Sequence, residues 1–232
     1  MTEKLRLDFR FPRHWEALHR FAISRLARSY EPYQPVTLGD RKIAPGARNC
    51  LDRWNQIDAI LKQYNARSLL DLGCAEGFFI QEAARSGLVA LGIDADVRRL
   101  TVAQNMTMID RVARAGFLYA EIDAPFIESL PNFDVTLFLS ILHHIIYGEG
   151  LDTARKIMAA IHKITNIGVV FDMGQSNEIS HEWSELLPRM DPNPRVWISN
   201  FLTEVGFSEV RVLQSTDAYM SGIRRELFWC IK

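Results

Sequence analysis

From residue 68 onward, short apolar runs alternate with longer stretches in which apolar residues recur at helical spacing. Each apolar run is followed by a glycine, a serine or an acidic residue. The pattern predicts strands at residues 68–72, 88–93, 117–122, 133–139 and 168–173, and helices at 77–85, 98–108, 151–164 and 195–205. Strands that are apolar nearly throughout are typical of a parallel sheet with helices on both faces.

Two late segments, 207–213 and 226–231, alternate apolar and polar residues and are predicted to pair as antiparallel strands. The first 50 residues show a helical stretch over 14–30 and then an irregular segment rich in proline and glycine. We therefore predict an α/β fold over residues 51–232. It has a doubly wound, mostly parallel, Rossmann-like sheet of seven strands, with an antiparallel strand near its C-terminus. Residues 1–50 are predicted to form a helical N-terminal extension or cap.

The composition changes this picture little. The chain has 232 residues, of which 48% are hydrophobic and 24% charged, enough for one large domain with a sizeable core. The net charge of -1 gives no global attraction to nucleic acid or to an anionic membrane. The first 28 residues, however, hold seven basic residues against three acidic ones, which is most simply a solvated helix face.

Three widely spaced cysteines form neither a disulfide framework nor a Cys-x-x-Cys metal site, and they favour a reducing compartment. The N-terminus lacks the apolar core of a signal peptide, and no apolar run approaches the roughly 18 residues of a membrane span. We therefore expect a cytoplasmic protein without a membrane span.

The loop after the first strand reads Asp-Leu-Gly-Cys-Ala-Glu-Gly over residues 71–77. Gly73 allows a sharp turn, and Gly77 opens the next helix so that a ligand can lie against backbone amides. The spacing matches neither a dinucleotide fingerprint nor a P-loop. Ligands of such sheets bind beyond the carboxyl ends of the strands, where Asp94 follows the second strand and can accept ribose hydroxyls.

The same loop resembles motif I of the class I S-adenosylmethionine-dependent methyltransferases, although Ala75 stands where the middle glycine is usual. The resemblance implies S-adenosylmethionine as cofactor, with Asp71 near the methionine ammonium group. It also implies an acid at the end of the third strand near the adenine amino group, namely Asp123, with Glu121 as the alternative. The predicted cofactor-binding residues are Asp71, Gly73, Cys74, Gly77, Asp94, Asp123 and Ser140.

The loop after the fourth strand excludes two kinds of methyltransferase. It lacks the Asn/Asp-Pro-Pro-aromatic motif of enzymes that methylate nucleic-acid bases. The Lys-Asp-Lys-Glu tetrad of ribose methyltransferases fails too, because Ser140 and Asp172 occupy two of its positions. The loop carries His143 and His144 instead, and histidine is the natural proton acceptor for a hydroxyl nucleophile. We predict His144 as the general base and His143 as second choice; helix capping or loop packing is the alternative.

The loop after the fifth strand is polar, and amides beside an indole suit a sugar. Residues from Leu139 onward resemble sugar and polysaccharide O-methyltransferases, including those acting on mannan ends and methylmannosides. The resemblance implies methylation of a hydroxyl of a sugar or oligosaccharide, with a mannoside as one candidate. The predicted substrate-binding residues are Tyr33, Arg48, Gln175 and Trp183.

Two further predictions concern a metal site and the N-terminal segment. Asp172 ends the fifth strand, where some related enzymes hold Mg²⁺, and Glu178 could join it. Residues 1–50 are expected to close over the acceptor as a lid, so that deletion of residues 1–45 spares cofactor binding and abolishes transfer. The alternatives are an RNA or protein methyltransferase, a methyltransferase of another small hydroxylated metabolite, and a binding module without catalysis. A nucleic-acid partner is disfavoured by the charge, and a homodimer is left open.

Overall fold

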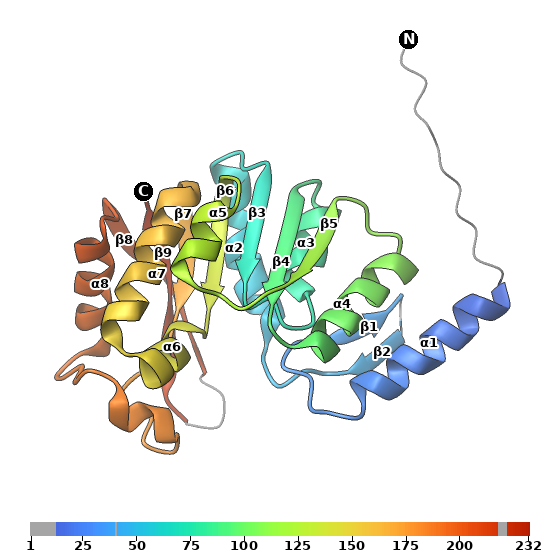
Figure 1. Cartoon of the computed structure of the whole chain (residues 1–232), viewed down its shortest axis with the longest axis horizontal. Helices are drawn as coiled ribbons and strands as arrows, with labels where there is room; N and C mark the ends of the chain where they lie inside the picture. The colour runs from blue at the N-terminus through green and yellow to red at the C-terminus, as the bar shows by residue number, and fades with distance from the viewer. Residues whose placement is uncertain (1–12, 40, 218–221) are drawn as a thin grey trace, which may run out of the picture.

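A seven-stranded sheet forms the centre of the molecule, with its strands in the order β5-β4-β3-β6-β7-β9-β8 (Figure 1). The structure is a computed structural model that describes residues 13–39, 41–217 and 222–232. The strands are β3 (Ser68–Leu72), β4 (Val89–Asp94), β5 (Ala115–Tyr119), β6 (Phe133–Leu139), β7 (Thr165–Asp172), β8 (Glu209–Asp217) and β9 (Arg224–Ile231). Strands β3 to β7 are parallel, whereas β9 is antiparallel to both of its neighbours. The predicted fold class is confirmed.

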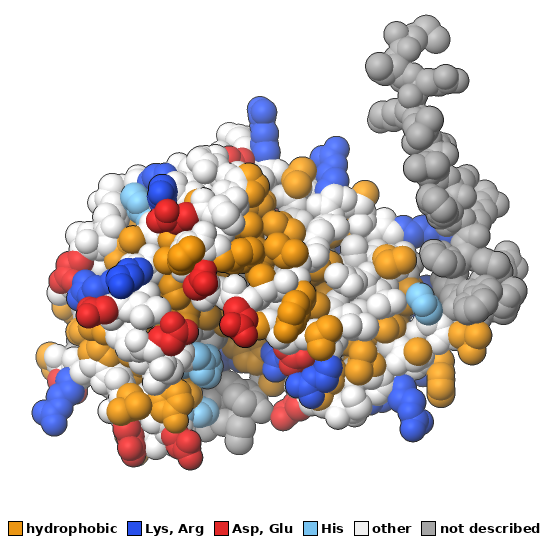
Figure 2. All heavy atoms as spheres, in the orientation of Figure 1, with side chains coloured by type: hydrophobic (Ala, Val, Ile, Leu, Met, Phe, Trp, Pro, Cys, Tyr) orange, Lys and Arg blue, Asp and Glu red, His pale blue; other side chains and the backbone are white. Residues whose placement is uncertain are grey.

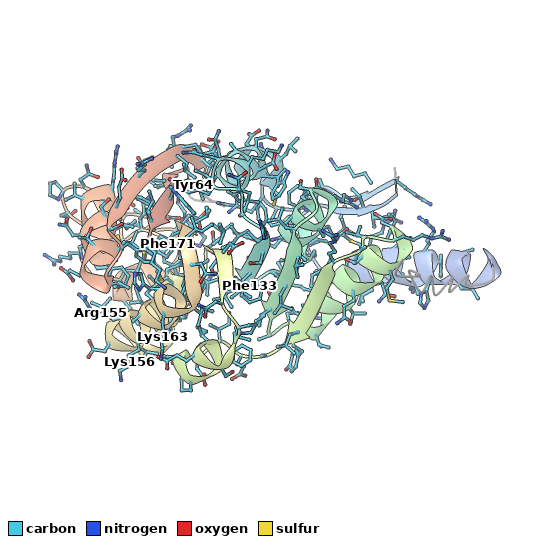
Figure 3. All side chains as sticks on the ribbon, turned by 90° about the horizontal axis from the view of Figure 1, so that it is seen from above. Tyr64, Phe133, Arg155, Lys156, Lys163 and Phe171 are labelled. Atoms are coloured by element: carbon cyan, nitrogen blue, oxygen red, sulfur yellow. The ribbon has the colours of Figure 1, made fainter. Side chains whose placement is uncertain are left out.

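Helices cover both faces of the sheet because both faces are apolar. One apolar core lies under α5 (Ala124–Ser129), α6 (Leu142–Glu149), α7 (Leu151–Ile164) and α8 (Pro194–Val205). The other lies under α2 (Cys50–Gln63), α3 (Phe78–Arg85) and part of α4 (Val97–Ile109). Seen from above, α7 turns Lys156 and Lys163 away from the sheet, where Phe171 of β7 packs in the core (Figure 3).

The third predicted strand is displaced. The sequence indicated residues 117–122, but β5 ends at Tyr119, and Asp123 is instead the N-cap residue of the short helix α5. Helix α6 and the 3₁₀ helix η1 (Glu182–Leu186) were not predicted. Both follow strand ends, where runs shorter than about three turns show little periodicity.

The N-terminal cap is more regular than its sequence suggests. Helix α1 (Arg13–Ala27) lies near the two-stranded hairpin β1 (Val36–Leu38) and β2 (Arg41–Ala44), a hairpin that the proline- and glycine-rich segment did not predict. Their apolar side chains form one cluster with Val102 and Met106 of α4. The cap therefore has an apolar core, and it shares that core with the main domain. None of the helices among the described residues has the length and apolar character needed to cross a bilayer.

Candidate active site

The loop between β3 and α3, residues 73–77, is called the cofactor loop because the sequence predicts that it binds the cofactor. Three of its residues have backbone angles in the left-handed region. Gly73, Ala75 and Gly77 have φ values of +81°, +47° and +76°. A Cβ atom at Gly73 would lie 2.4 Å from Cδ1 of Ile141, so that glycine is required by close packing as well as by its φ. Ala75 adopts the same conformation with a Cβ, at a cost of about 1 kcal/mol. The loop thus keeps the geometry of a glycine turn although one glycine is replaced.

A cleft of about 870 Å³ opens at the carboxyl ends of the parallel strands. In Figure 2 it is the hollow at the lower centre, with histidine side chains on the side of α6 and basic side chains on the side of α4. Its lining includes seven residues of the predicted site: Tyr33, Gly73, Asp94, Ser140, His143, His144 and Trp183. Three further lining residues, Arg99, His181 and Arg225, were not predicted, because no motif marks them.

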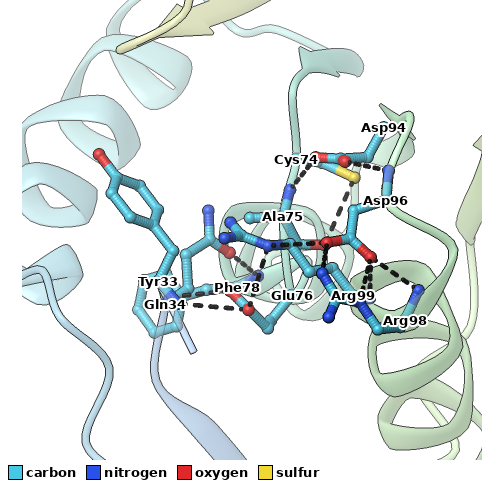
Figure 4. A network of polar contacts seen from close by, with 10 residues as sticks. All are labelled: Tyr33, Gln34, Cys74, Ala75, Glu76, Phe78, Asp94, Asp96, Arg98 and Arg99. Carbon is cyan, nitrogen blue, oxygen red and sulfur yellow. Dashed lines mark hydrogen bonds and ion pairs between the residues drawn. The ribbon is translucent and has the colours of Figure 1, made fainter. Parts of the chain in front are cut away.

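Asp94 is fixed at the tip of β4 by two backbone amides. Its Oδ2 atom accepts a hydrogen bond from the Ala75 amide at 2.8 Å, and its Oδ1 atom accepts one from the Asp96 amide at 2.8 Å (Figure 4). Each carboxylate oxygen has further lone-pair capacity, and the side chain lines the cleft. This arrangement fits a nucleoside whose ribose hydroxyls donate to Asp94.

Asp71 is buried beneath the loop, and its Oδ2 atom has no hydrogen-bond partner. Burial, together with the nearby charge of Asp94, raises the pKa of Asp71 to about 8. An uncompensated buried carboxyl group of this kind would be satisfied by a cationic donor, which fits the ammonium group of S-adenosylmethionine. Cys74 is buried too, and burial raises the pKa of its thiol well above the usual value.

Asp123 lies outside the cleft. Its exposed side chain caps α5 by accepting a hydrogen bond from the Phe126 amide at 2.7 Å. Glu121 is exposed as well and does not line the cleft. The assignment of either acid to adenine therefore stays a prediction. It gains no support from the structure because β5 ends at Tyr119, before both acids.

The N-terminal cap is fastened to the cofactor loop by a reciprocal clamp (Figure 4). The carboxylate of Glu76, fully buried, accepts the backbone amides of Tyr33 at 3.2 Å and Gln34 at 2.8 Å. In return, the Gln34 side-chain oxygen accepts the Phe78 amide at 2.8 Å, in the first turn of α3. Such amides have no partner within their own helix, so the cap supplies an acceptor that α3 lacks. The motif I loop and the cap thus form one structural unit.

The two histidines have different environments. His143 is buried, and its Nδ1 atom accepts the Gly174 amide at 3.0 Å. Burial, followed by the neighbouring charge of His144, places the pKa of His143 well below its usual value. The ring of His144 lies 4.2 Å from that of His143 but is exposed. Desolvation, then the charges of Arg225 and His181, lowers the pKa of His144 as well.

Trp183 is held in place by three side chains. His181 stacks on its ring at 5.0 Å and 13°, His143 lies 4.4 Å away, and the Arg225 guanidinium lies 5.5 Å from its centroid. A Cβ at Gly174 would approach the edge of the indole to 2.4 Å. The indole therefore forms a fixed wall of the cleft.

Asp172 does not have the surroundings of a metal ligand. Its carboxylate accepts hydrogen bonds from Arg53 at 3.1 Å and from Ser140 at 2.7 Å, and its side chain is 1% exposed. Burial disfavours its charged form, but the adjacent guanidinium groups, led by Arg53, outweigh burial and lower the pKa of Asp172. Both oxygens of Glu178 are taken by Arg225. In the described part of the chain no cluster of three or more histidine, cysteine or acidic residues could hold a metal ion, so this donor set does not fit Mg²⁺.

Two predicted substrate residues, Arg48 and Gln175, are not among the residues that line the cleft. Arg48 is buried and donates from Nη1 to the Asp217 carbonyl oxygen at 3.1 Å. The side-chain amide of Gln175 donates to the Arg224 carbonyl oxygen at 3.2 Å. Both side chains support the loops around the cleft, and neither lines it.

The strand order, the glycine-type turn after β3 and the carboxylate at the tip of β4 together define the fold class. The chain has the fold of the class I, S-adenosylmethionine-dependent methyltransferases. Its sequence is 29% identical over 158 residues to the O-antigen chain terminator bifunctional methyltransferase/kinase WbdD of Escherichia coli. The match covers 64% of this chain and 22% of WbdD, so the chain corresponds to only about a fifth of that relative. No known protein-family model matches the chain.

Solved structures share the fold. The crystal structure of WbdD covers 90% of this chain and 46% of its own, with a TM-score of 0.73 and 22% identity. The N-terminal domain of EvdMO1, solved with S-adenosylhomocysteine and D-fucose, has a TM-score of 0.65 at 17% identity and covers 92% and 96% of the two chains. Magnesium protoporphyrin IX methyltransferase from Synechocystis PCC 6803, solved with S-adenosylmethionine, has a TM-score of 0.57 at 14% identity and covers 78% of each chain.

Proposed function

We propose that this chain transfers a methyl group from S-adenosylmethionine to a hydroxyl oxygen of a sugar or oligosaccharide, with a mannoside among the candidate acceptors. The observation that carries the proposal is that one cleft joins the nucleoside-binding carboxylate Asp94 to the histidine His144 and the fixed indole of Trp183. The cofactor and the sugar can therefore bind side by side in one cleft, with a proton acceptor next to them.

His144 acts as the general base in this proposal. Its pKa is lowered, so the ring is neutral at pH 7 and can take the proton of an acceptor hydroxyl. The cofactor, when bound, supplies a methyl group already activated on a sulfonium. The protein then has to orient the hydroxyl opposite the departing sulfur and remove its proton.

His143 is the positioning residue of this pair. Because its Nδ1 atom accepts the Gly174 amide, the neutral ring carries its hydrogen on Nε2 and has no free acceptor atom. It holds the loop after β7 against α6 and contacts both His144 and Trp183. This hydrogen bond supports His144 rather than His143 as the general base.

A sugar acceptor is supported by the lining of the cleft and by the relatives. Trp183 and Tyr33 offer flat aromatic surfaces for the C–H side of a sugar ring, and His144 and Arg225 offer polar groups. WbdD is an O-antigen chain terminator, and the EvdMO1 domain was solved with D-fucose. Other small hydroxylated metabolites remain the alternative acceptors.

A transfer assay tests the proposal. The purified chain is incubated with S-adenosylmethionine carrying a labelled methyl group and with methylmannosides, mannose oligosaccharides, RNA and protein in separate reactions. We expect label in the mannosides or oligosaccharides, with mass spectrometry placing the methyl group on oxygen. Transfer to RNA or protein alone would contradict a sugar as the acceptor, although the chain would still be an S-adenosylmethionine-dependent methyltransferase.

We propose the same domain division that the sequence predicts, with residues 1–50 as a cap and 51–232 as the catalytic domain. Tyr33 gives the cap a side chain in the cleft, where the Arg99 guanidinium lies 5.9 Å from its ring centroid. This contact supports a lid over the acceptor. The cytoplasmic location and a homodimer are also retained as predictions, the latter tested by light scattering in solution.

A further inference from the structure

A second groove lies on the N-terminal cap, between α1 and the β1–β2 hairpin. It encloses about 780 Å³ and shares no lining residue with the methyl-transfer cleft. Its apolar surface includes Leu38 and Ile43, both buried, and the largely exposed ring of Phe21. Its basic residues are Arg20, Arg25, Arg28 and Arg41. Of the described residues that line this groove, none carries a carboxylate.

The outer surface of α1 continues the same combination of groups. Leu18 and Phe21 are 59% and 66% exposed, far more than large apolar side chains of a packed helix. Arg25 and Arg28 are exposed. Arg25 is four residues from Phe21 on the same side of α1, and Arg28 is three residues further on, in the turn that follows the helix. Figure 2 shows apolar and basic side chains next to each other at the lower right, over α1.

We propose that this surface of the cap docks on an anionic phospholipid bilayer. Arginine side chains bind lipid phosphates, and exposed apolar side chains between them enter the boundary between head groups and acyl chains. The chain as a whole has a net charge of -1, so the attraction comes from the local concentration of arginines.

A lipid surface fits the groove better than a nucleic acid does. A groove for single-stranded nucleic acid combines cations along the backbone with several aromatic rings for the bases. Among the described residues that line the groove, Phe21 is the one aromatic side chain, and the other apolar side chains are aliphatic. Those aliphatic groups, Leu38 and Ile43 among them, favour an acyl chain beneath the arginines.

Vesicle co-sedimentation tests the proposal on the full chain. We expect binding to phosphatidylcholine vesicles that contain phosphatidylglycerol and little binding to phosphatidylcholine alone. Each arginine near an anionic surface contributes about 1 kcal/mol, so Arg25→Ala with Arg28→Ala should weaken binding about 25-fold. Phe21→Ser should weaken the part of the binding that persists at high salt, where charge attraction is screened.

The matched control changes Arg189 and Arg195 to alanine, because both are exposed arginines far along the chain from the cap. It should bind vesicles as the unchanged chain does, and circular dichroism establishes that each variant is folded. The proposal would be overturned if the control variant lost as much vesicle binding as the double variant. It would also be overturned if the chain bound both kinds of vesicle equally, or bound single-stranded RNA instead of vesicles. So would complete competition by inorganic phosphate, which would indicate a free-anion site. The result does not depend on the acceptor of the methyl group.

Discussion

The carboxylate of Glu76 accepts the backbone amide of Gln34 at 2.8 Å, which joins the cofactor loop to the N-terminal cap through a fully buried contact. The sequence predicted that the cap is a lid and that deleting it spares cofactor binding. The clamp leads to a different expectation, because the cap also holds the loop on which the cofactor lies. A change that disturbs the cap should therefore also weaken cofactor binding.

Glu76→Ala tests this coupling. The change leaves two buried amides without an acceptor, so the free energy of unfolding should fall by about 1–3 kcal/mol and S-adenosylhomocysteine should bind more weakly. Thermal denaturation and isothermal titration calorimetry measure the two effects. Glu185→Ala, an exposed residue of η1, is the matched control. Cofactor affinity equal to that of the unchanged chain would leave the cap as a lid only.

Asp94→Ala should weaken binding of S-adenosylhomocysteine by about 1–3 kcal/mol, because ribose hydroxyls and two loop amides lose their acceptor. Asp123→Ala provides the comparison. Asp123 caps α5 outside the cleft, so its loss should lower stability by about 0.5–2 kcal/mol and leave affinity nearly unchanged. Calorimetry on both variants gives the result. A larger loss of affinity in Asp123→Ala than in Asp94→Ala would restore the adenine role that the sequence implied.

His144→Gln should lower kcat by about 10²–10⁴-fold with cofactor affinity intact, as expected for loss of a general base. The neutral ring is the active form, so activity of the unchanged enzyme should rise with pH through the pKa of His144 and then level off. That pKa is lowered, so the midpoint should lie below the ordinary histidine value of about 6.5. His162→Gln on α7 serves as control. Turnover of His144→Gln within about threefold of the unchanged enzyme, with the same pH profile, would exclude the role.

Asp71 should make cofactor binding depend on pH. Its pKa of about 8 leaves the group largely protonated at pH 7, whereas a bound ammonium group lowers that pKa and releases a proton. Affinity for S-adenosylhomocysteine should therefore increase between pH 6 and about 8. Calorimetry in two buffers of different ionisation enthalpy detects the released proton, and Asp71→Asn should abolish the difference. Identical heats in both buffers for the unchanged chain would place the ammonium group elsewhere.

Removal of divalent metals should leave the activity unchanged, because the Asp172 carboxylate is paired with Arg53. Asp172→Asn should instead destabilise the fold by about 3–5 kcal/mol, since the buried guanidinium group loses its counter-charge. Denaturant unfolding measures this loss, with Asp152→Asn, an exposed acid of α7, as control. Activity that disappears with a chelator and returns with Mg²⁺ would reinstate the metal site.

The sequence by itself determined the fold class and the cofactor loop. Apolar runs long enough to fill a covered parallel sheet, each followed by a glycine, a serine or an acid, are local properties of the chain. The strands β3, β4 and β6 could therefore be located within a residue or two. Asp94 ends β4 and His144 lies in α6, the helix after β6, and the parallel arrangement brings the carboxyl ends of these strands to one edge of the sheet.

Only the tertiary structure decided which polar side chains face the cleft. Asp172 and Ser140 end neighbouring strands, as cleft residues do, but Arg53 arrives from α2, distant in sequence, and draws the Asp172 carboxylate into a buried ion pair. Arg225 reaches the cleft from β9 because that strand is antiparallel and begins where β7 ends. The clamp of Glu76 on Gln34 likewise spans 42 residues. Such contacts depend on charge pairing and on the desolvation of groups brought together by folding, neither of which leaves a periodic signal in the sequence.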